Sequence, residues 1–396
     1  MKPIYLMITA TLTALSMTAP LLSKAEELPT DHAQTIKPAT IKVLLHERKD
    51  SLLLEVNGAY KIFCPHTNVL LSSGVSAKRD FVRPGEDGIS WKELLPGIYA
   101  LRIVPANNQT TFLVNGIQYK GCLELYDLGG SLRALNEVDV ENYLKSSLAT
   151  KFTDVTEKEV LNSLAIIART DAYYRIQKEA SSPWHVTADE SDYAGFAVTL
   201  QNLPLEAAIG ETRHAILAYH GKPFAATWTE NSAGKTASFS SIFRKNTPSP
   251  KGVTIPGMES ERLRSGWSFQ VDKEELAKMV HVAAVSSLSV FSEKESGKVY
   301  AIKVGNDDKA NTLDFFTLQN ALGESKLKSN DFTVEILDNS IKFRGYGQGS
   351  GVGLCLYSAT LMAKQGLDAK RILSEFFADT TLEKLRTLPS KETKAL

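Results

Sequence analysis

Glycines recur at alternate positions near the C-terminal end of this 396-residue chain and could form a ligand-binding loop. Gly345, Gly347, Gly349, Gly351 and Gly353 follow an extended run and give way to an apolar helical pattern. Since glycine has no Cβ, such a run permits positive φ and lets backbone N–H groups approach a ligand closely. A glycine loop that leads into a helix N-terminus can present several unpaired donors together. A tight strand-to-helix turn, whose glycines only allow close packing, explains the same spacing equally well.

The glycine run matches neither standard phosphate-binding loop. The P-loop requires G-x-x-x-x-G-K-[ST], and Ser350-Gly351-Val352 stands where its last residues would be. A G-x-G-x-x-G register does not fit the glycines cleanly either. Lysine plus arginine and aspartate plus glutamate both number 45, whereas nucleic-acid binders usually carry a basic excess. The pattern and the charge therefore point away from nucleotides and nucleic acids.

The N-terminus is typical of an export signal. Residues 4–17 are largely apolar but too short and interrupted to span a bilayer well. Ser23-Lys24-Ala25 places small residues at the spacing of a cleavage site. We predict a signal peptide that is removed after export, with a retained anchor as the alternative. No later segment is apolar enough for a transmembrane helix, so we expect an exported protein of the periplasm or cell envelope.

Three cysteines are available in a compartment that permits disulfides: Cys64, Cys122 and Cys355. Cys64 and Cys122 both lie in extended, alternating stretches and could bridge one another. Cys355 would then remain as a small buried residue. No pair has the C-x-x-C spacing that is common in zinc sites.

Residues 41–135 alternate short apolar runs with turn signals, which predicts a β-rich N-terminal lobe. Asn57-Gly58 and Asn115-Gly116 each separate two such runs, and Asn-Gly in this setting predicts a β-hairpin.

The clearest helix is predicted over Glu157–Lys178, where apolar residues recur at helical spacing. Thr156 with Glu159 has the spacing of a capping box. Two shorter helices are predicted over residues 354–364 and 369–377, the first ended by Gly366 and the second capped by Asp368.

The long helix carries Arg169-Thr170 within SLAIIARTDA, and it follows the stretch YLKSSLATKF that begins at Tyr143. These stretches are similar to A-L-K-A-Q-A-V-A-A-R-T-Y-A and Y-L-x-G-V-V-x-S-E-M-P of the SpoIID/LytB family. That family comprises stage II sporulation protein D and the amidase enhancers.

Two further blocks resemble the same family, in the same order along the chain. Residues 216–236 resemble V-L-x-Y-x-G-x-P-I-x-A-x-Y-x-S-x-S-G-G-x-T, with Ala233 in place of the first glycine of the S-G-G element. The glycine run resembles G-x-G-x-G-H-G-V-G-M-S-Q-x-G-A-x-x-M-A-x-x-G, with Ser350 in place of the histidine. Gly266-Trp267 followed by Glu274–Val280 resembles the family's tryptophan and the short helix after it, which implies a short helix here. The resemblance covers roughly residues 41 to 385.

The resemblance implies action on peptidoglycan. Enzymes of this family are lytic transglycosylases that cut glycan strands, especially strands stripped of stem peptides, while other members stimulate a partner amidase. The cleavage needs one carboxyl group, which protonates the leaving glycosidic oxygen and then helps the sugar's own 6-hydroxyl attack the anomeric carbon. Ordinary glycoside hydrolysis instead uses two carboxyls and a water. Acid/base work at neutral pH requires a raised carboxyl pKa, usually from burial.

The family supplies this carboxyl from the glutamate of S-E-M-P, and Lys151 stands at that position. A lysine, whose unperturbed pKa is about 10.4, is a poor proton donor and acceptor at neutral pH. Deep desolvation or neighbouring cations would have to lower its pKa by several units. Glu230 is the first choice as a replacement carboxylate because a motif block carries it, ahead of Glu190, Asp192 and Glu141. For each of these four, a solvated surface or structural carboxylate is the more ordinary explanation.

The resemblance also implies a glycan groove between the glycine loop, the Arg169-Thr170 helix and the loop of Ser232. Its candidate substrate-binding residues are Arg169, Ser232, Lys235, Thr236, Tyr346, Gln348, Ser350 and Gly351. Arg169 could hold a carboxylate bidentately, although a buried arginine paired to a local acid fits equally well. Some members bind zinc through a histidine and two cysteines after this helix. Here His185 is present without either cysteine, so we predict no metal and no cofactor.

We therefore predict an α+β fold in five parts. These are a signal peptide (1–25), a flexible lead-in (26–40), a β-rich N-terminal lobe (41–135), a mixed SpoIID-like core closed by C-terminal helices (136–385) and a polar tail (386–396). The first functional hypothesis is a peptidoglycan-remodelling protein that cuts glycan strands, preferably denuded ones, in cell division or envelope remodelling. The second is a catalytically silent relative that binds glycan or activates a partner peptidoglycan amidase. The simultaneous loss of the family's glutamate, loop histidine and zinc cysteines favours the second.

Overall fold

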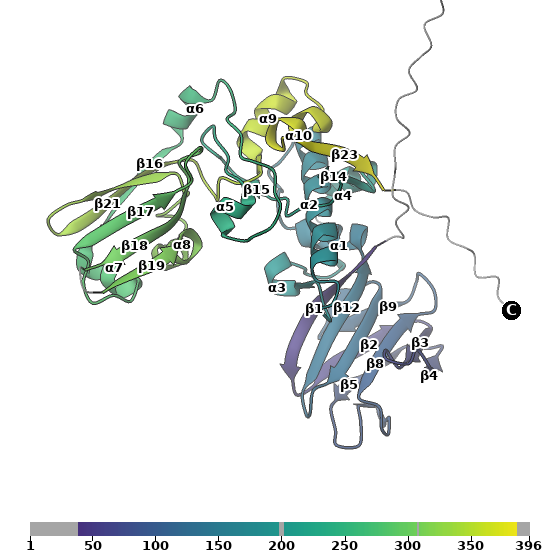
Figure 1. Ribbon diagram of the computed structural model, residues 1–396. Helices are drawn as coiled ribbons and strands as arrows, with labels where there is room; N and C mark the ends of the chain where they lie inside the picture. The colour runs from purple at the N-terminus through teal and green to yellow at the C-terminus, as the bar shows by residue number, and fades with distance from the viewer. Residues whose placement is uncertain (1–38, 198–201, 307–308, 386–396) are drawn as a thin grey trace, which may run out of the picture. The chain divides into compact units, whose positions relative to one another are not determined.

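The computed structural model describes residues 39–197, 202–306 and 309–385 (Figure 1). The predicted signal peptide, most of the lead-in and the polar tail lie outside these residues. The structure mixes helices with strands throughout, which confirms the α+β class. Within the described ranges, no helix is long and apolar enough to cross a membrane. The predicted boundary between a β-rich lobe and a core stays a prediction, because a continuous apolar core runs from the first strands to the last helices.

Strands β1 to β12 occupy the first hundred described residues and form two antiparallel sheets. Their bounds are β1 (Thr40–Lys49), β2 (Leu52–Asn57), β3 (Tyr60–Phe63), β4 (Leu70–Gly74), β5 (Lys78–Arg83), β6 (Ser90–Trp91), β7 (Glu93–Leu94), β8 (Ala100–Pro105), β9 (Thr111–Val114), β10 (Ile117–Tyr119), β11 (Cys122–Asp127) and β12 (Leu132–Asp139). One sheet has the order β13-β1-β12-β11-β8-β3-β4, in which β13 (Val186–Thr187) pairs parallel to β1; the other has the order β10-β9-β2-β5-β6-β7.

The two predicted Asn-Gly hairpins have different outcomes. Asn115-Gly116 joins β9 to β10 with Val114 opposite Ile117, and both turn residues have positive φ, as a two-residue hairpin requires. The hairpin at Asn57-Gly58 is wrong, because β2 and β3 belong to different sheets. Gly58 instead turns a corner between the sheets, with a φ of +122° and no room for a Cβ beside Thr110.

The central helix α2 (Lys158–Lys178) confirms the predicted long helix and is enclosed by other elements (Figure 1). It contacts α1 (Val140–Leu148), α4 (Leu203–Glu211), α9 (Leu356–Lys364), α10 (Ala369–Phe376) and strand β14 (Ala215–Tyr219). The predicted capping box is wrong: the residue before the helix is Glu157, whose side chain makes no capping bond. The Glu159 carboxylate instead accepts the backbone N–H of Ala369 at 2.9 Å, which ties α2 to the start of α10.

The C-terminal helices follow the prediction closely. Helix α9 begins at Leu356 because the two preceding residues form β22 (Leu354–Cys355), which pairs parallel with β15 (Trp228–Thr229). Gly366, at a φ of +88°, follows its end. Asp368 caps α10 by accepting the backbone N–H of Arg371 at 2.8 Å. The last strand, β23 (Thr380–Lys384), pairs antiparallel with β14.

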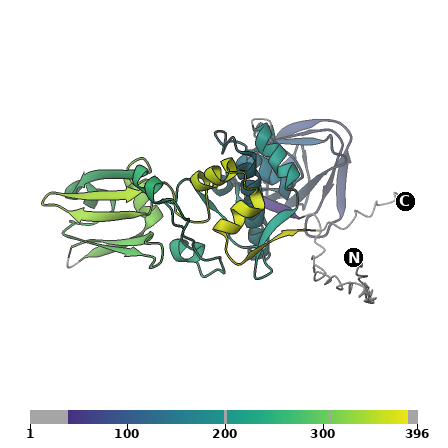
Figure 2. The same ribbon diagram turned by 90° about the horizontal axis from the view of Figure 1, so that it is seen from above.

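A second group of elements has its own apolar core (Figure 2). It contains the sheet β16-β21-β20, formed by Gly266–Asp272, Ser340–Tyr346 and Phe332–Ile336, and the sheet β17-β18-β19, formed by Ser287–Ser292, Val299–Gly305 and Ala310–Asp314. Helix α7 (Lys273–Met279), which confirms the predicted short helix, and α8 (Phe315–Leu322) contribute to the same core. Short helices α3 (Ala188–Ser191), α5 (Phe239–Phe243) and α6 (Glu259–Arg264) complete the described elements.

Candidate functional site

Backbone N–H groups of the glycine loop donate hydrogen bonds to other parts of the protein. The N–H of Gly347 donates to the carbonyl of Ser265 at 3.1 Å, and that of Gly349 donates to the carbonyl of Lys328 at 2.8 Å. The N–H of Gly351 donates to the Thr229 hydroxyl at 3.1 Å. These groups are therefore not free to cradle a ligand.

Close packing explains why the loop needs glycine. A Cβ on Gly345 would lie 2.3 Å from the Trp267 ring, and a Cβ on Gly353 would lie 2.0 Å from the carbonyl oxygen of Thr227. Real Cβ atoms do not approach other heavy atoms so closely. The packing alternative raised by the sequence is thus the one that the structure displays.

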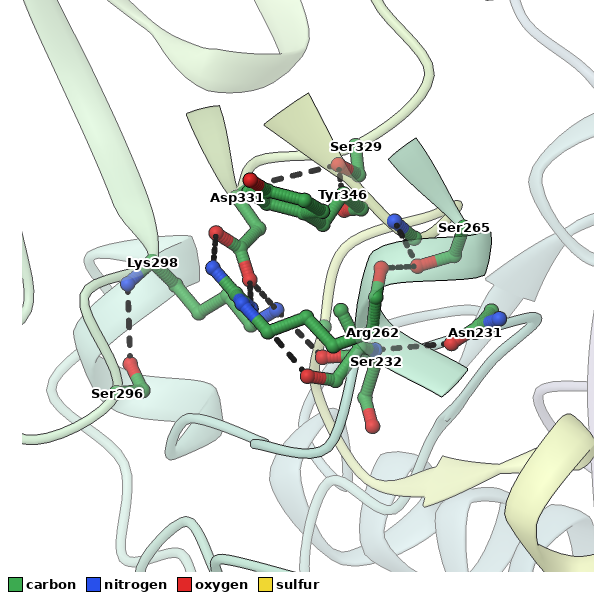
Figure 3. Close-up of polar contacts among 12 residues, drawn as sticks. Asn231, Ser232, Arg262, Ser265, Ser296, Lys298, Ser329, Asp331 and Tyr346 are labelled. Atoms are coloured by element: carbon green, nitrogen blue, oxygen red, sulfur yellow. Dashed lines mark hydrogen bonds and ion pairs between the residues drawn. The ribbon is translucent and has the colours of Figure 1, made fainter. Parts of the chain in front are cut away.

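A buried ion cluster fixes this loop to the neighbouring strands (Figure 3). The Asp331 carboxylate accepts hydrogen bonds from both terminal nitrogens of Arg262 and from Lys298 Nζ, the last at 3.0 Å. Lys298, whose side chain is 1% exposed, also donates to the carbonyl of Ser232 at 2.7 Å. The Arg262 guanidinium lies 4.3 Å from the ring centroid of Tyr346. The cluster joins the loop, the Ser232 segment and β20 into one rigid arrangement.

The cluster shifts two pKa values. Burial lowers the pKa of Lys298, despite the opposing charge of Asp331. For Asp331, burial opposes ionisation, but the Arg262 hydrogen bonds and the Lys298 charge outweigh it and hold the pKa below the usual aspartate value. Both groups are therefore best described as structural.

Several residues predicted to contact substrate are buried. Arg169 is fully buried and donates to both carboxylate oxygens of Glu141, at 2.9 and 2.8 Å. The prediction that it lines the groove is therefore wrong, and the alternative of a buried arginine paired to a local acid is what the structure has. Ser232 and Thr236 are also buried, so their side chains do not face solvent, and Gly351 is buried as well.

The remaining predicted contact residues are at least partly exposed. Lys235 lines a hollow of about 320 Å³ with Thr254 and Ser296. Gln348 is exposed, although its backbone pairs in both directions with Asn231. Ser350 and Tyr346 are partly exposed.

Neither predicted catalytic residue lies in a setting suited to acid/base work. Lys151 forms an ion pair with Asp192 at 2.6 Å and is 32% exposed. Its ammonium group lies 5.6 Å from the ring centroid of Trp228, so it neighbours the cleft described next. Glu230 is exposed and lies against Gly349.

A cleft of about 600 Å³ lies along α2, and we call it the α2 cleft. One wall is α2 itself, the second comes from residues 182–190, and the third comes from residues 225–228 with α5. Aromatic rings are frequent in its lining: Tyr174, Trp184, Trp228, Phe239 and Phe243. All five rings are partly exposed, and aromatic surface of this kind suits ring-shaped ligands. The Trp228 ring is held edge-on against Phe152, the residue after Lys151, at 5.2 Å.

The α2 cleft contains a chain of charged side chains that sequence reasoning missed in part. Asp171 accepts a hydrogen bond from Arg175 Nε at 2.6 Å, and Arg175 also bonds to Glu190 at 2.7 Å. The Asp171 side chain is 26% exposed and lines the cleft. Burial raises the pKa of the Asp171 carboxyl above its usual value, against the opposing charge of Arg175. Of the carboxylates weighed from the sequence, Glu190 is the one that lines this cleft.

A sequence signal for Asp171 did exist. It directly follows Arg169-Thr170, at the position where the family pattern has a tyrosine, and Arg175 stands four residues later on the same helix face. A carboxylate that interrupts an apolar helix next to a motif is a candidate for a partly buried acid.

The described part of the chain contains neither a cluster of metal ligands nor a disulfide. No group of three or more histidine, cysteine, aspartate or glutamate side chains is placed to hold a metal ion among those residues. Cys64, Cys122 and Cys355 are all free thiols, so the possible Cys64–Cys122 bridge is not formed.

The fold and the cleft together define a mixed α+β protein with a surface site of ligand-binding size. Residues 129–219, which include α1, α2 and β14, match the family model described as stage II sporulation protein. The chain belongs to the SpoIID/LytB family.

Individual relatives agree with this assignment. A Chlamydia pneumoniae protein of uncharacterised function is 35% identical over 185 residues, which is 46% of this chain and 67% of the relative. Stage II sporulation protein D of Bacillus amyloliquefaciens is 26% identical over 220 residues, 55% of this chain and 59% of the relative. The amidase enhancer of Bacillus subtilis (strain 168) is 25% identical over 337 residues, 72% of this chain and 47% of the relative.

Proposed function

We propose that this protein is exported to the periplasm or cell envelope and remodels peptidoglycan by binding glycan strands in the α2 cleft and cutting them. The observation that carries the proposal is a carboxyl of raised pKa, Asp171, inside an aromatic-walled cleft beside the position of the family's glutamate. Membership of the SpoIID/LytB family and similarity to a protein named amidase enhancer support a role at the cell wall.

The chemistry assigned to Asp171 is lytic transglycosylase-like. The protonated carboxyl gives its proton to the glycosidic oxygen as the bond from that oxygen to the anomeric carbon breaks. The resulting carboxylate then takes the proton of the sugar's own 6-hydroxyl as that oxygen bonds to the anomeric carbon. The carboxyl is restored, no water is consumed, and a 1,6-anhydro end is left. Burial raises the pKa of Asp171, which is the direction that proton donation by a carboxyl requires.

Arg175 and Glu190 would position this acid. Arg175 Nε donates to Oδ2 of Asp171, while Nη1 of the same guanidinium donates to Glu190. Trp184 and Trp228 would contact the apolar faces of the sugar rings.

A second candidate function is glycan binding without cleavage, with or without activation of a partner amidase. The observation that favours it is Lys151, which replaces the family's glutamate with a cation already paired to Asp192. In that case the α2 cleft would bind strands and Asp171 would only hold Arg175.

Product analysis separates the two candidates. The purified exported protein would be incubated with denuded and with peptide-bearing glycan strands, and soluble products would be examined by mass spectrometry for 1,6-anhydro ends. Cleavage that is lost in Asp171→Asn and kept in Lys151→Ala and Glu230→Gln is the expected result. Co-sedimentation with strands but no anhydro products from the unchanged protein would establish the second candidate. Cleavage by Asp171→Asn at the unchanged rate would remove Asp171 from the mechanism.

A further inference from the structure

A second hollow continues the α2 cleft along the last turns of α2. It measures about 740 Å³ and shares Tyr174, Lys178 and Lys245 with the cleft. We call it the lysine groove; its far end is lined by Tyr219, His220, Lys222, Pro223, Thr247 and Pro248. Because the two hollows share lining residues, they adjoin each other on the surface.

The segments that carry the lysines are held by specific hydrogen bonds. Tyr219 and Lys222 exchange backbone bonds of 2.8 and 3.2 Å across a two-residue turn, whose central residues both have positive φ. The Tyr174 hydroxyl lies 2.9 Å from the Thr247 hydroxyl, which fastens the segment after Lys245 to α2. Lys222 and Lys245 therefore reach the groove from two separately anchored segments.

The two hollows differ in charge. The α2 cleft is lined by the carboxylates of Asp171, Glu179 and Glu190, whereas no acidic side chain lines the lysine groove among the described residues. Lys222 and Lys245 are exposed and form no ion pair within residues 39–197, 202–306 and 309–385. Lys178 is paired with the neighbouring Glu179 at 3.1 Å. The groove thus offers a bound anion two lysines that form no ion pair within the described residues, and the charge of one of them, Lys245, also acts on Asp171 of the adjoining cleft.

We propose that the lysine groove binds a carboxylate carried by the glycan strand whose neighbouring sugars occupy the α2 cleft. This inference rests on the proposed function, since it assumes that the cleft holds glycan. The carboxylate has two sources on a peptidoglycan strand: the lactyl group of alternate sugars after peptide removal, or the attached stem peptide. The rings of Tyr174 and Tyr219 and the prolines give the apolar contact that the sugar faces require.

Binding of matched ligands tests the inference. The ligands are denuded peptidoglycan octasaccharide, the same strand with stem peptides, and chitin octasaccharide, which has a related sugar backbone without carboxylates. Affinities would be measured by calorimetry at low and moderate salt in an Asp171→Asn background, so that strands stay intact. The test variant is Lys222→Gln/Lys245→Gln, and the control is Lys303→Gln, an exposed lysine of β18 that lines neither hollow.

We expect a carboxylate-bearing strand to bind about 3- to 10-fold more tightly than chitin, a range that corresponds to two partly screened charge contacts. The double variant should bind each peptidoglycan strand only as tightly as it binds chitin, and the control should behave as the unchanged protein. Added salt should reduce the preference for carboxylate-bearing strands over chitin. Preference for the denuded strand identifies the lactyl carboxylate, and preference for the peptide-bearing strand identifies the stem peptide.

If all three ligands bind with equal affinity and the double variant does not change these affinities, the proposal that the lysine groove binds a carboxylate is overturned, while the proposed function stands. No binding of any ligand would overturn both.

Discussion

Replacing Arg169 by methionine tests whether this arginine stabilises the fold or holds a glycan. Its guanidinium donates to both oxygens of Glu141, at 2.9 and 2.8 Å. It also donates to the carbonyl oxygens of Ile209 and Ala215, at 3.1 and 3.0 Å. Methionine has a similar length but supplies none of these bonds, so the variant leaves a buried carboxylate and two buried carbonyls without this donor.

The expected loss of unfolding free energy is about 3–5 kcal/mol, because removing one partner of a buried ion pair leaves the other charge uncompensated. The carbonyl bonds belong to the same buried cluster, so their contributions do not add separately. Urea unfolding measures the loss from the shift in midpoint at constant slope.

Two further variants serve as controls for Arg169→Met. Arg264→Met breaks an ion pair with Glu261 in which the arginine is 75% exposed, and it should cost no more than about 1 kcal/mol. Arg169→Met/Glu141→Gln should be more stable than Arg169→Met, since no buried charge remains. A loss below about 1 kcal/mol in Arg169→Met, together with lost glycan binding, would refute the structural role and return Arg169 to the binding site.

Three more outcomes follow from the structure. Gly353→Ala should lower the unfolding free energy by about 3 kcal/mol through overpacking and strain, against about 1 kcal/mol for Gly366→Ala, where a Cβ meets open space; equal losses would contradict the packing argument. Asp331 has a lowered pKa, so its stabilisation is present above the usual value of 3.8 and is lost as pH falls through the lower folded value. Asp331→Asn should therefore unfold more easily at pH 7 and show a flatter acid dependence in pH-resolved melting. Hydrogen bonding from Thr67 lowers the pKa of Cys64, so iodoacetamide should modify that thiol first and buried Cys355 last. Mass spectrometry of the modified protein gives the order; a Cys64 that stays unmodified because it forms a disulfide would contradict the prediction.

Local signals account for the elements that the sequence predicted well. The apolar period of α2, the Asn115-Gly116 turn and the Asp368 cap each depend on a few neighbouring residues, and the structure has all three. In these three cases the local side chains and dihedral angles favour the same structure as the surrounding packing.

The predictions that failed depended on contacts between segments that are distant in the sequence. Asn57-Gly58 has the same local chemistry as the true hairpin, but its flanking strands pair in different sheets, which no local residue specifies. The sequence left Arg169 open between a groove residue and a buried partner of a local acid, because the helices and the strand that cover α2 come from distant parts of the chain. Asp171 was missed for the related reason that the cleft beside it is built by residues 182–190 and 225–228, far away in sequence.

The parallel pairing of β15 with β22 also constrains the order in which this protein can fold. The bond between Thr229 and Gly351 joins residues that are 122 positions apart, with the whole second core between them. Closing so long a loop costs chain entropy before the contact forms, and distant contacts of this kind slow folding. Trp228 can thus take its place in the α2 cleft only after β22 is available. If the chain crosses a membrane from its N-terminus, as the proposed function requires, the α2 cleft stays incomplete until β22 has crossed as well.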